Sequence, residues 1–206
     1  MCLVSSQRVD ADSSGRVERG SMSKTFLKAY YAIDDPLEDL DGPPRSLGWW
    51  RRLRAATPQP TRKDVTFTSL KGWHSRLTLC EVLADRSDMV TRIVGEEVKD
   101  LYRGHYETAR SVRLERGTPL GTVINVSPER QAEHVRRIVD TPAIALTEGR
   151  LDLLNGRTVE VYALDFPLKA LPDENPFVLT LYEFQTPQPL STLPHRGLQN
   201  FPNGRD

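Results

Sequence analysis

Alternating hydrophobic and polar positions predict a β-hairpin near the middle of the chain. Residues 77–83 and 89–94 are rich in aliphatic and β-branched side chains, and the polar residues 85–88 lie between them. Two such runs on either side of a short turn are typical of antiparallel strands. We therefore expect the two segments to pair with each other within one sheet.

The spacing of apolar residues changes to that of helices after Gly95. A short helix is predicted there because four apolar side chains recur on one face: Val94, Val98, Leu101 and Tyr102. A second helix is predicted to begin at Ser127-Pro128-Glu129, since serine caps a helix and proline fits its first position. Its apolar face continues to about Asp140.

Strand-type spacing returns from Ala143 onwards. The Asn155-Gly156 pair is a strong hairpin signal, and it precedes a strand predicted over residues 158–166. The last strand is predicted over residues 177–184. Two strands, a helical middle and three strands predict an α+β domain, in which helices cover one face of a five-stranded antiparallel sheet. A cavity can form between that sheet and its helices.

A leading helix and two polar ends complete the predicted organisation. Residues 46–56 form an amphipathic helix whose apolar stripe is flanked by arginines. It precedes the sheet within a domain predicted over residues 44–186. Residues 1–43 are expected to be a mostly disordered extension, apart from a short helix within residues 22–43. Residues 187–206 are expected to be a flexible proline-rich tail.

Composition narrows the class of protein. The chain has 206 residues, 28 basic and 28 acidic side chains, and a formal net charge of zero, which fits one domain with tails. No stretch of about 18 apolar residues is present, so no transmembrane segment is expected. Two cysteines are too few for a disulfide scaffold. Because the first 20 residues lack a secretory signal, we expect a cytoplasmic location.

Charge is distributed unevenly along the neutral chain. Residues 44–76 carry eight basic side chains and one acidic side chain, so an anionic partner would bind there first. The leading helix within this block is predicted to be an interaction helix through Trp49, Trp50, Leu53 and Arg54. Such a helix can lie on an anionic membrane or a partner. We favour packing on the sheet or dimerisation, since an exposed apolar patch usually marks an interface.

Several short motifs resemble those of a bacterial subgroup of PAS domains, whose members are short and lack a fused output domain. The opening helix of that subgroup carries a tryptophan and a Leu-Arg pair before a Pro-x-Arg-x-Asp stretch. This chain matches those positions with Trp50, Leu53, Arg54, Pro60, Arg62 and Asp64. Arg92-Ile93-Val94-Gly95 matches an Arg-x-x-Gly turn, and Phe166-Pro167-Leu168 matches a strand ending in Pro-Leu. The similarity covers about residues 46–186.

The resemblance implies a sensory or ligand-binding module in bacterial signalling and not an enzyme. One position departs from the pattern, because the subgroup has a Thr-Gly pair where this chain has Thr108-Ala109. Alanine adopts positive φ less readily than glycine, so the path of the chain at the cavity mouth is expected to differ. PAS domains bind haem, flavins, small metabolites or nothing, so the resemblance leaves the cofactor unknown.

The residues that haem and flavin would require argue against both cofactors. Haem-binding PAS proteins carry their axial histidine on the long helix before the third strand, where this chain has His134. The apolar face of that helix centres on Val135, and at about 100° per residue His134 falls on its flank. We therefore expect a surface or boundary histidine. Cys80 lies in mid-strand, which argues against a flavin adduct, and the histidines show no metal-ligand spacing.

Five side chains are candidates for a ligand pocket between sheet and helices: Arg92, Tyr102, His105, Tyr106 and Tyr162. If Arg92 turned inward, it would need an anionic partner. That partner would be a ligand carboxylate or an internal acid such as Glu81 or Glu160, and we favour the internal acid or simple exposure. No catalytic residue is assigned. A small cone-shaped isomerase or dehydratase would need an acid/base pair in its cavity, and the sequence reveals none.

The sequence therefore favours a non-catalytic PAS-like module for sensing, ligand binding or protein interaction. The alternative is an adaptor or localisation protein that uses its basic Trp/Arg helix on a partner or on a membrane surface. A small-molecule ligand and a homodimer or protein partner are expected, and nucleic acid is not. No metal site is expected.

Overall fold

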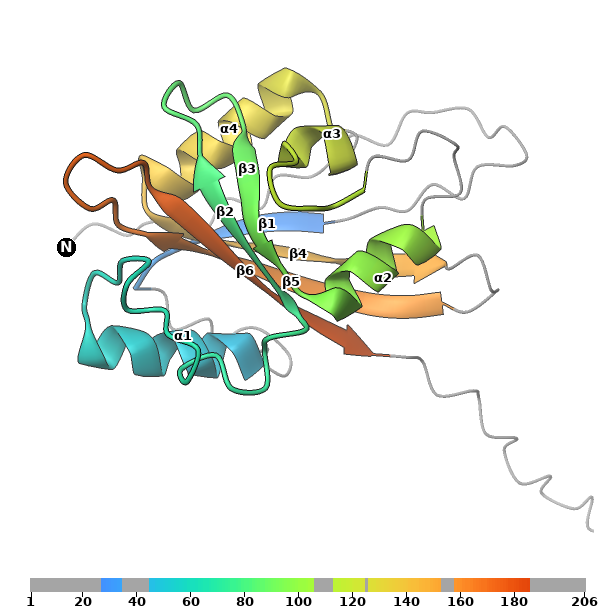
Figure 1. Cartoon of the computed structure of the whole chain (residues 1–206), viewed down its shortest axis with the longest axis horizontal. Coiled ribbons are helices and arrows are strands. Elements are labelled where there is room, and N and C mark those ends of the chain that lie inside the picture. The colour runs from blue at the N-terminus through green and yellow to red at the C-terminus, as the bar shows by residue number, and fades with distance from the viewer. Residues whose placement is uncertain (1–26, 35–44, 106–112, 125, 153–157, 186–206) are drawn as a thin grey trace, which may run out of the picture.

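A six-stranded antiparallel sheet forms the centre of the molecule in the computed structural model, which describes residues 27–34, 45–105, 113–124, 126–152 and 158–185 (Figure 1). Its strands follow the order β1-β4-β5-β6-β2-β3. They are β1 (Leu27–Ala32), β2 (Leu77–Val82), β3 (Met89–Val94), β4 (Ala143–Asp152), β5 (Thr158–Leu168) and β6 (Phe177–Gln185). The predicted class, an α+β domain with an antiparallel sheet, is confirmed.

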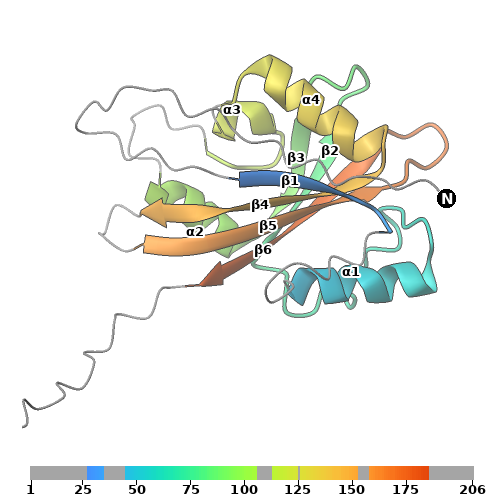
Figure 2. The same cartoon turned by 180° about the vertical axis from the view of Figure 1, so that it is seen from behind.

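Helices cover both faces of this sheet, whereas the sequence predicted five strands with helices on one face. One face carries α1 (Arg45–Ala56), and the other carries α2 (Glu96–His105), α3 (Leu120–Ile124) and α4 (Pro128–Val139) (Figures 1 and 2). We call these the α1 face and the α4 face. The prediction was wrong on this point because the period of a helix shows which side is apolar but not which face of a sheet will cover it.

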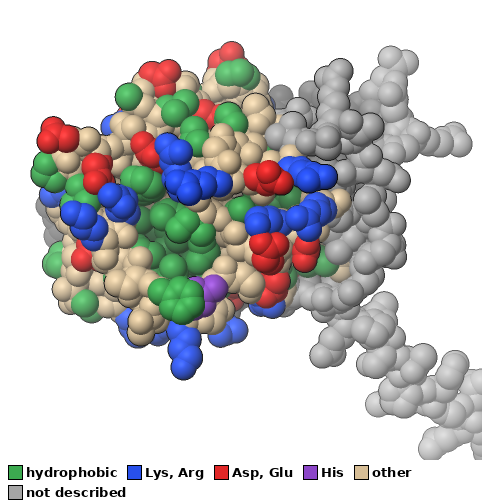
Figure 3. Space-filling model, viewed as in Figure 1, with side chains coloured by type: hydrophobic (Ala, Val, Ile, Leu, Met, Phe, Trp, Pro, Cys, Tyr) green, Lys and Arg blue, Asp and Glu red, His purple; other side chains and the backbone are tan. Residues whose placement is uncertain are grey.

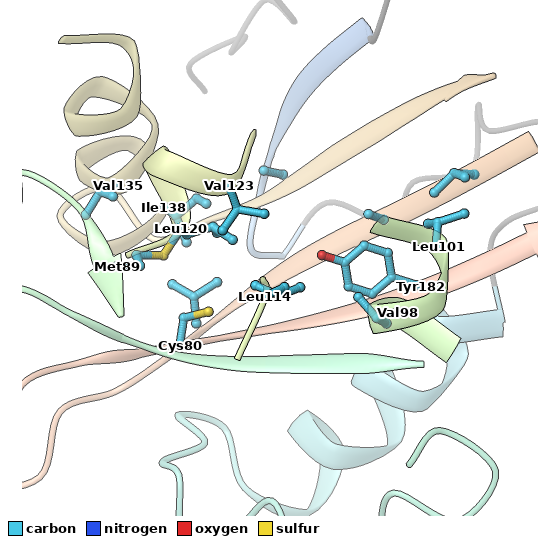
Figure 4. Packing of buried hydrophobic residues seen from close by; sticks show 14 of the residues in the cluster. Cys80, Met89, Val98, Leu101, Leu114, Leu120, Val123, Val135, Ile138 and Tyr182 are labelled. Atoms are coloured by element: carbon cyan, nitrogen blue, oxygen red, sulfur yellow. The ribbon is translucent and has the colours of Figure 1, made fainter. Parts of the chain in front are cut away.

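The first two predicted strands lie in the same sheet as the three C-terminal strands, as expected. β2 pairs with β3 through neighbours such as Cys80 and Thr91, with a register shift between Leu79 and Cys80. On its other side β2 pairs with β6. The intervening helices α2, α3 and α4 lie over these strands, and their apolar side chains share one cluster with Cys80 and Met89 (Figure 4).

The sixth strand lies where the sequence predicted a mostly disordered extension. β1 pairs antiparallel with β4, so that Tyr30 is opposite Ala145 and Tyr31 is opposite Ile144. Tyr30 then packs on the α4 face and Tyr31 on the α1 face, as alternation along a strand requires. Expecting disorder, with at most a short helix, was wrong for these residues. The other parts of the extension, apart from residues 33–34, and the predicted tail lie outside the described residues.

The start of α4 follows the predicted capping signal. The Ser127 hydroxyl accepts a hydrogen bond from the backbone N–H of Arg130 at 3.4 Å, and Pro128 occupies the first helical position. These contacts satisfy a donor that would otherwise be unpaired at the helix terminus. On the apolar face of the helix, Val135 and Ile138 are fully buried. Local sequence thus fixes where α4 begins.

Gly95, the last residue of the Arg-x-x-Gly match, has a steric role between β3 and α2. A methyl group added at this position would meet the backbone of Ser75 and would lie 2.7 Å from the carbonyl oxygen of His74. No side chain fits there without moving the backbone of the segment before β2. Glycine therefore allows this segment to pack closely against the β3–α2 turn.

Candidate functional site

A row of residues crosses the sheet on the α4 face. Each is the register partner of the next on the neighbouring strand, in the order Tyr30, Ala145, Asp165, Thr180 and Thr78. Most side chains around this row are aliphatic. Three strands thus bring a phenol, a carboxylate and a hydroxyl into one line beneath α4. The small methyl group of Ala145 leaves space between the first two.

His134 of α4 occupies that space and links the row into a hydrogen-bonded chain. The Tyr30 hydroxyl lies 2.8 Å from Nδ1 of His134. Nε2 of the same ring lies 3.1 Å from Oδ2 of Asp165, and the Thr180 hydroxyl donates to Oδ1 of Asp165 at 2.6 Å. His134 is 5% exposed and Asp165 is 9% exposed. We call these four residues the polar chain.

The partners determine where the protons lie. An ionised carboxylate only accepts hydrogen bonds, so with Asp165 in that form Nε2 of His134 is the donor of this pair. In the neutral imidazole Nδ1 then accepts the proton of the Tyr30 hydroxyl. Burial raises the pKa of Tyr30 to about 12, although the nearby Arg137 guanidinium acts in the opposite direction. Tyr30 is therefore a stable donor at neutral pH.

The burial of His134 corrects the prediction that it lies at the surface or at a boundary. The helical phase placed it correctly on the flank of the apolar face. That flank is covered because β1, which the sequence did not reveal, brings Tyr30 beneath it. Both ring nitrogens already have protein partners. In this arrangement neither nitrogen is left to ligate a haem iron.

Cys80 lies on the same face, deep in the cluster shown in Figure 4. Burial raises the pKa of its thiol to about 12, so the reactive thiolate is not formed near neutral pH. Its sulfur lies 3.9 Å from the Thr91 hydroxyl. Tyr182, which packs beside Val98 and Leu101 of α2 in Figure 4, also has a pKa well above its usual value because it is buried. Both groups stay neutral.

Arg92 does not face a pocket. Its guanidinium is exposed and forms an ion pair with Glu81 at 2.7 Å, which is one of the two acids proposed from the sequence. Glu81 also accepts a hydrogen bond from Asn175, and this bond, followed by Arg92, lowers the pKa of the carboxyl group. The other acid, Glu160, pairs with Arg150. Arg92 is thus a surface residue, in agreement with the reading favoured above.

The remaining pocket candidates do not converge. Tyr102 packs against the cluster of the α4 face, whereas Tyr162 packs against that of the α1 face. The sheet separates them, so the two side chains cannot line one pocket. His105 ends α2, but its side chain lies outside the described residues, as does all of Tyr106. Tyr102 and Tyr162 therefore do not belong to one pocket.

The predicted interaction helix is also corrected. Trp49 and Trp50 are buried in the chain's own core, where Trp50 stacks on Phe166 with ring centroids 4.8 Å apart. Leu53 packs at the edge of the same cluster. Arg54 donates to the carbonyl oxygen of Ile33 and pairs with Asp34. Packing on the sheet, the favoured reading, is what the structure has, and the tryptophans are not available to a partner.

Three further findings bear on the site. Within the described part of the chain, no group of three or more His, Cys, Asp or Glu side chains could hold a metal ion. The helices described there are all too short or too polar to cross a membrane. Comparisons with protein-family models, with curated proteins and with solved structures give no match. The function must therefore be inferred from the geometry of this chain.

Residue spacing alone did not reveal the polar chain. Its members are 104 residues apart between Tyr30 and His134 and 31 apart between His134 and Asp165. One signal was present in the sequence, since Asp165 interrupts an otherwise apolar run from Val161 to Leu168. A carboxylate in a buried strand needs a partner.

Proposed function

We propose that the chain is a non-catalytic PAS-like module for sensing or interaction in bacterial signalling. The order of elements supports this proposal, because two strands, a helical middle and three strands follow one another as in the family it resembles. The helical middle covers one face of the sheet that these strands form. Such a layer can change its position on the sheet when a ligand or a partner binds.

The observation that carries the proposal is the polar chain between α4 and the sheet. Burying polar groups is costly unless every one is hydrogen-bonded, so this contact is stable in one alignment of α4 and much less so in others. A small displacement of the helix separates His134 from Tyr30 and Asp165 together. A ligand or partner that favours the displaced arrangement would shift the population towards it.

A catalytic role is less well supported, although His134 and Asp165 are an acid/base pair that the sequence did not reveal. A general base must reach a proton of its substrate. Nδ1 of His134 is occupied by Tyr30 and Nε2 by Asp165, and the imidazole is buried. The contacts of the pair hold α4 on the sheet and leave no ring nitrogen for a substrate.

Native mass spectrometry of protein purified from its own host tests the proposal. We expect an added mass, from a small molecule or from a second subunit, that disappears under denaturing conditions. A His134→Leu/Asp165→Val variant should change its occupancy at least about tenfold if ligand binding and α4 position are coupled. Glu174→Gln, at an exposed ion pair with Arg62, is the matched control and should leave the occupancy unchanged. An unliganded monomer would contradict the proposal.

A further inference from the structure

Five exposed cations lie in the part of the chain from α1 to β2 without an ion pair to any described residue. Eight basic residues and one acid occur in residues 45–76. Three of the eight are neutralised by acids elsewhere, in the pairs Arg54–Asp34, Arg62–Glu174 and Arg76–Glu97. The acid of the block, Asp64, accepts bonds from Thr61. The cations that remain are Arg45, Arg51, Arg52, Lys63 and Lys71.

Most of these cations share one continuous surface, because α1 and the following segment pack together. The indole N–H of Trp49 donates to the carbonyl oxygen of Ser69 at 2.5 Å. The guanidinium of Arg45 lies 5.8 Å from the centre of the Trp73 ring, and the guanidinium of Arg52 lies beside Gly48 on the same helix. Figure 3 shows basic side chains projecting from the lower edge of the molecule, where Figure 1 places α1.

An aromatic side chain stands out from the same segment. Phe67 is 79% exposed and stacks on the ring of His74 with centroids 3.9 Å apart. The turn that carries it is fixed by paired hydrogen bonds, from the Thr66 N–H to the Ser69 hydroxyl at 3.0 Å and from the Ser69 N–H to the Thr66 hydroxyl at 3.1 Å. The hydrogen bonds of this turn therefore fix the backbone on either side of Phe67 while its ring remains exposed to solvent.

We infer that this surface docks on a lipid bilayer that contains anionic phospholipid. Each Lys or Arg near such a bilayer raises partitioning roughly fivefold, and an exposed apolar ring adds affinity by entering the headgroup region. The excess of cations without an ion pair to a described residue matches the charge of the headgroups, and Phe67 supplies the apolar contact. Nucleic acid is a poorer fit, because the stacking that would hold a base is already made on one face of Phe67 by His74.

This inference does not depend on the proposed function. The polar chain lies on the α4 face, whereas the docking surface is built by α1 and the residues after it, beyond the other face of the sheet. An experiment can therefore contradict the proposed function without contradicting the docking surface, and the reverse. The sequence suggested the tryptophans of α1 as the contact with a membrane or partner. Because these are buried, the contact is assigned to exposed arginines, Lys71 and Phe67.

Vesicle flotation of the full chain tests the inference. We expect binding to phosphatidylcholine vesicles with about 30% phosphatidylglycerol, little binding to phosphatidylcholine alone, and loss of binding in about 0.5 M salt. Arg52→Glu/Lys71→Glu should weaken binding at least about twentyfold. Phe67→Ser should weaken it about fivefold. These positions are exposed, and the midpoint of urea unfolding checks that the variants are folded.

Arg116→Glu/Arg130→Glu is the matched control, with the same change in net charge on exposed arginines near the α4 face. The affinity of this variant for the anionic vesicles should stay within about threefold of that of the unchanged chain. Equal losses in both double variants, or no binding to anionic vesicles, would overturn the inference. If Phe67→Ser bound the anionic vesicles as tightly as the unchanged chain, the Phe67 ring would not contribute to docking. Tighter binding to a single-stranded oligonucleotide than to vesicles would replace the bilayer with nucleic acid.

Discussion

The two faces of the sheet are held by different kinds of contact. On the α1 face the indole of Trp50 stacks on Phe166, and Leu47 and Leu164 complete a largely apolar layer. On the α4 face an aliphatic layer surrounds the polar chain, which links α4 to β1 and β5 through His134. When a helix moves slightly on the sheet, the stabilisation from apolar packing decreases gradually, whereas the hydrogen bonds of the polar chain are lost together.

This difference assigns separate roles to the faces. The α1 face is a rigid support, because removing aromatic area from it costs free energy without offering another arrangement. In the proposed function the α4 face is the one that responds, since a buried polar network contributes little net stability but specifies one position of the helix strongly. The four predictions below test this contrast, from the largest expected effect to the smallest.

Trp50→Ala should be the most destabilising of these changes. It removes a fully buried indole from its stack on Phe166, so the free energy of unfolding should fall by about 3–5 kcal/mol. Urea unfolding monitored by circular dichroism measures this loss. Arg51→Ala, an exposed change on the same helix, should stay within about 0.5 kcal/mol. A loss below about 1 kcal/mol for Trp50→Ala would contradict the support role of the α1 face.

Asp165→Val should cost about 3 kcal/mol, because it leaves the N–H of His134 buried without its acceptor. Adding His134→Leu should recover more than half of that loss, since an apolar pair replaces the contact between His134 and Asp165 and no imidazole N–H is left buried without its acceptor. A double-mutant cycle by urea unfolding gives the coupling energy. If the two losses simply add, His134 and Asp165 do not act as a pair and the account of the α4 face is wrong.

Ser127→Ala should lower the free energy of unfolding by about 1 kcal/mol, because it removes the cap of α4. The change loosens the helix without touching the polar chain. Thr141→Ala, at an exposed position just past the other end of the helix, serves as the control and should have little effect. A larger loss than that of Asp165→Val would show that α4 is held mainly by its own terminus.

The smallest effect is expected at alkaline pH. Below pH 10 Tyr30 is protonated in both the folded and the unfolded chain, so it contributes no pH dependence. Above pH 10 the unfolded phenol ionises, whereas the folded one keeps its proton until its pKa of about 12. Stability should therefore fall between these values, and Tyr30→Phe should make this fall shallower. An identical pH profile for the variant would place the Tyr30 hydroxyl outside the buried chain.

Local signals predicted the parts of the fold that local chemistry controls. The cap at Ser127 fixed the start of α4, and Gly95 fits where only a hydrogen atom has room. β1 was missed because a strand of six residues forms only where the free edge of β4 receives it. The burial of His134 depends on β1 and was missed with it.

The surface residues show the same limit. Phe67 stays exposed although it is aromatic. Trp49 belongs to the apolar stripe of α1, and the segment after the helix packs against it as well, since its indole N–H donates to the carbonyl oxygen of Ser69. The exposure of Phe67 does not follow from periodicity, since it depends on which residue the returning segment covers.

Amide hydrogen exchange tests the contrast between the two faces most directly. We predict that amides of α4, such as those of Val135 and Ile138, exchange through openings that cost clearly less free energy than global unfolding, whereas the amide of Trp50 exchanges only on global unfolding. The His134→Leu/Asp165→Val variant, which removes the contact that holds α4, should speed exchange in α4, whereas exchange at Trp50 should change only as much as the free energy of global unfolding does. Exchange of both helices at the global free energy, or faster exchange in α1 than in α4, would contradict the account.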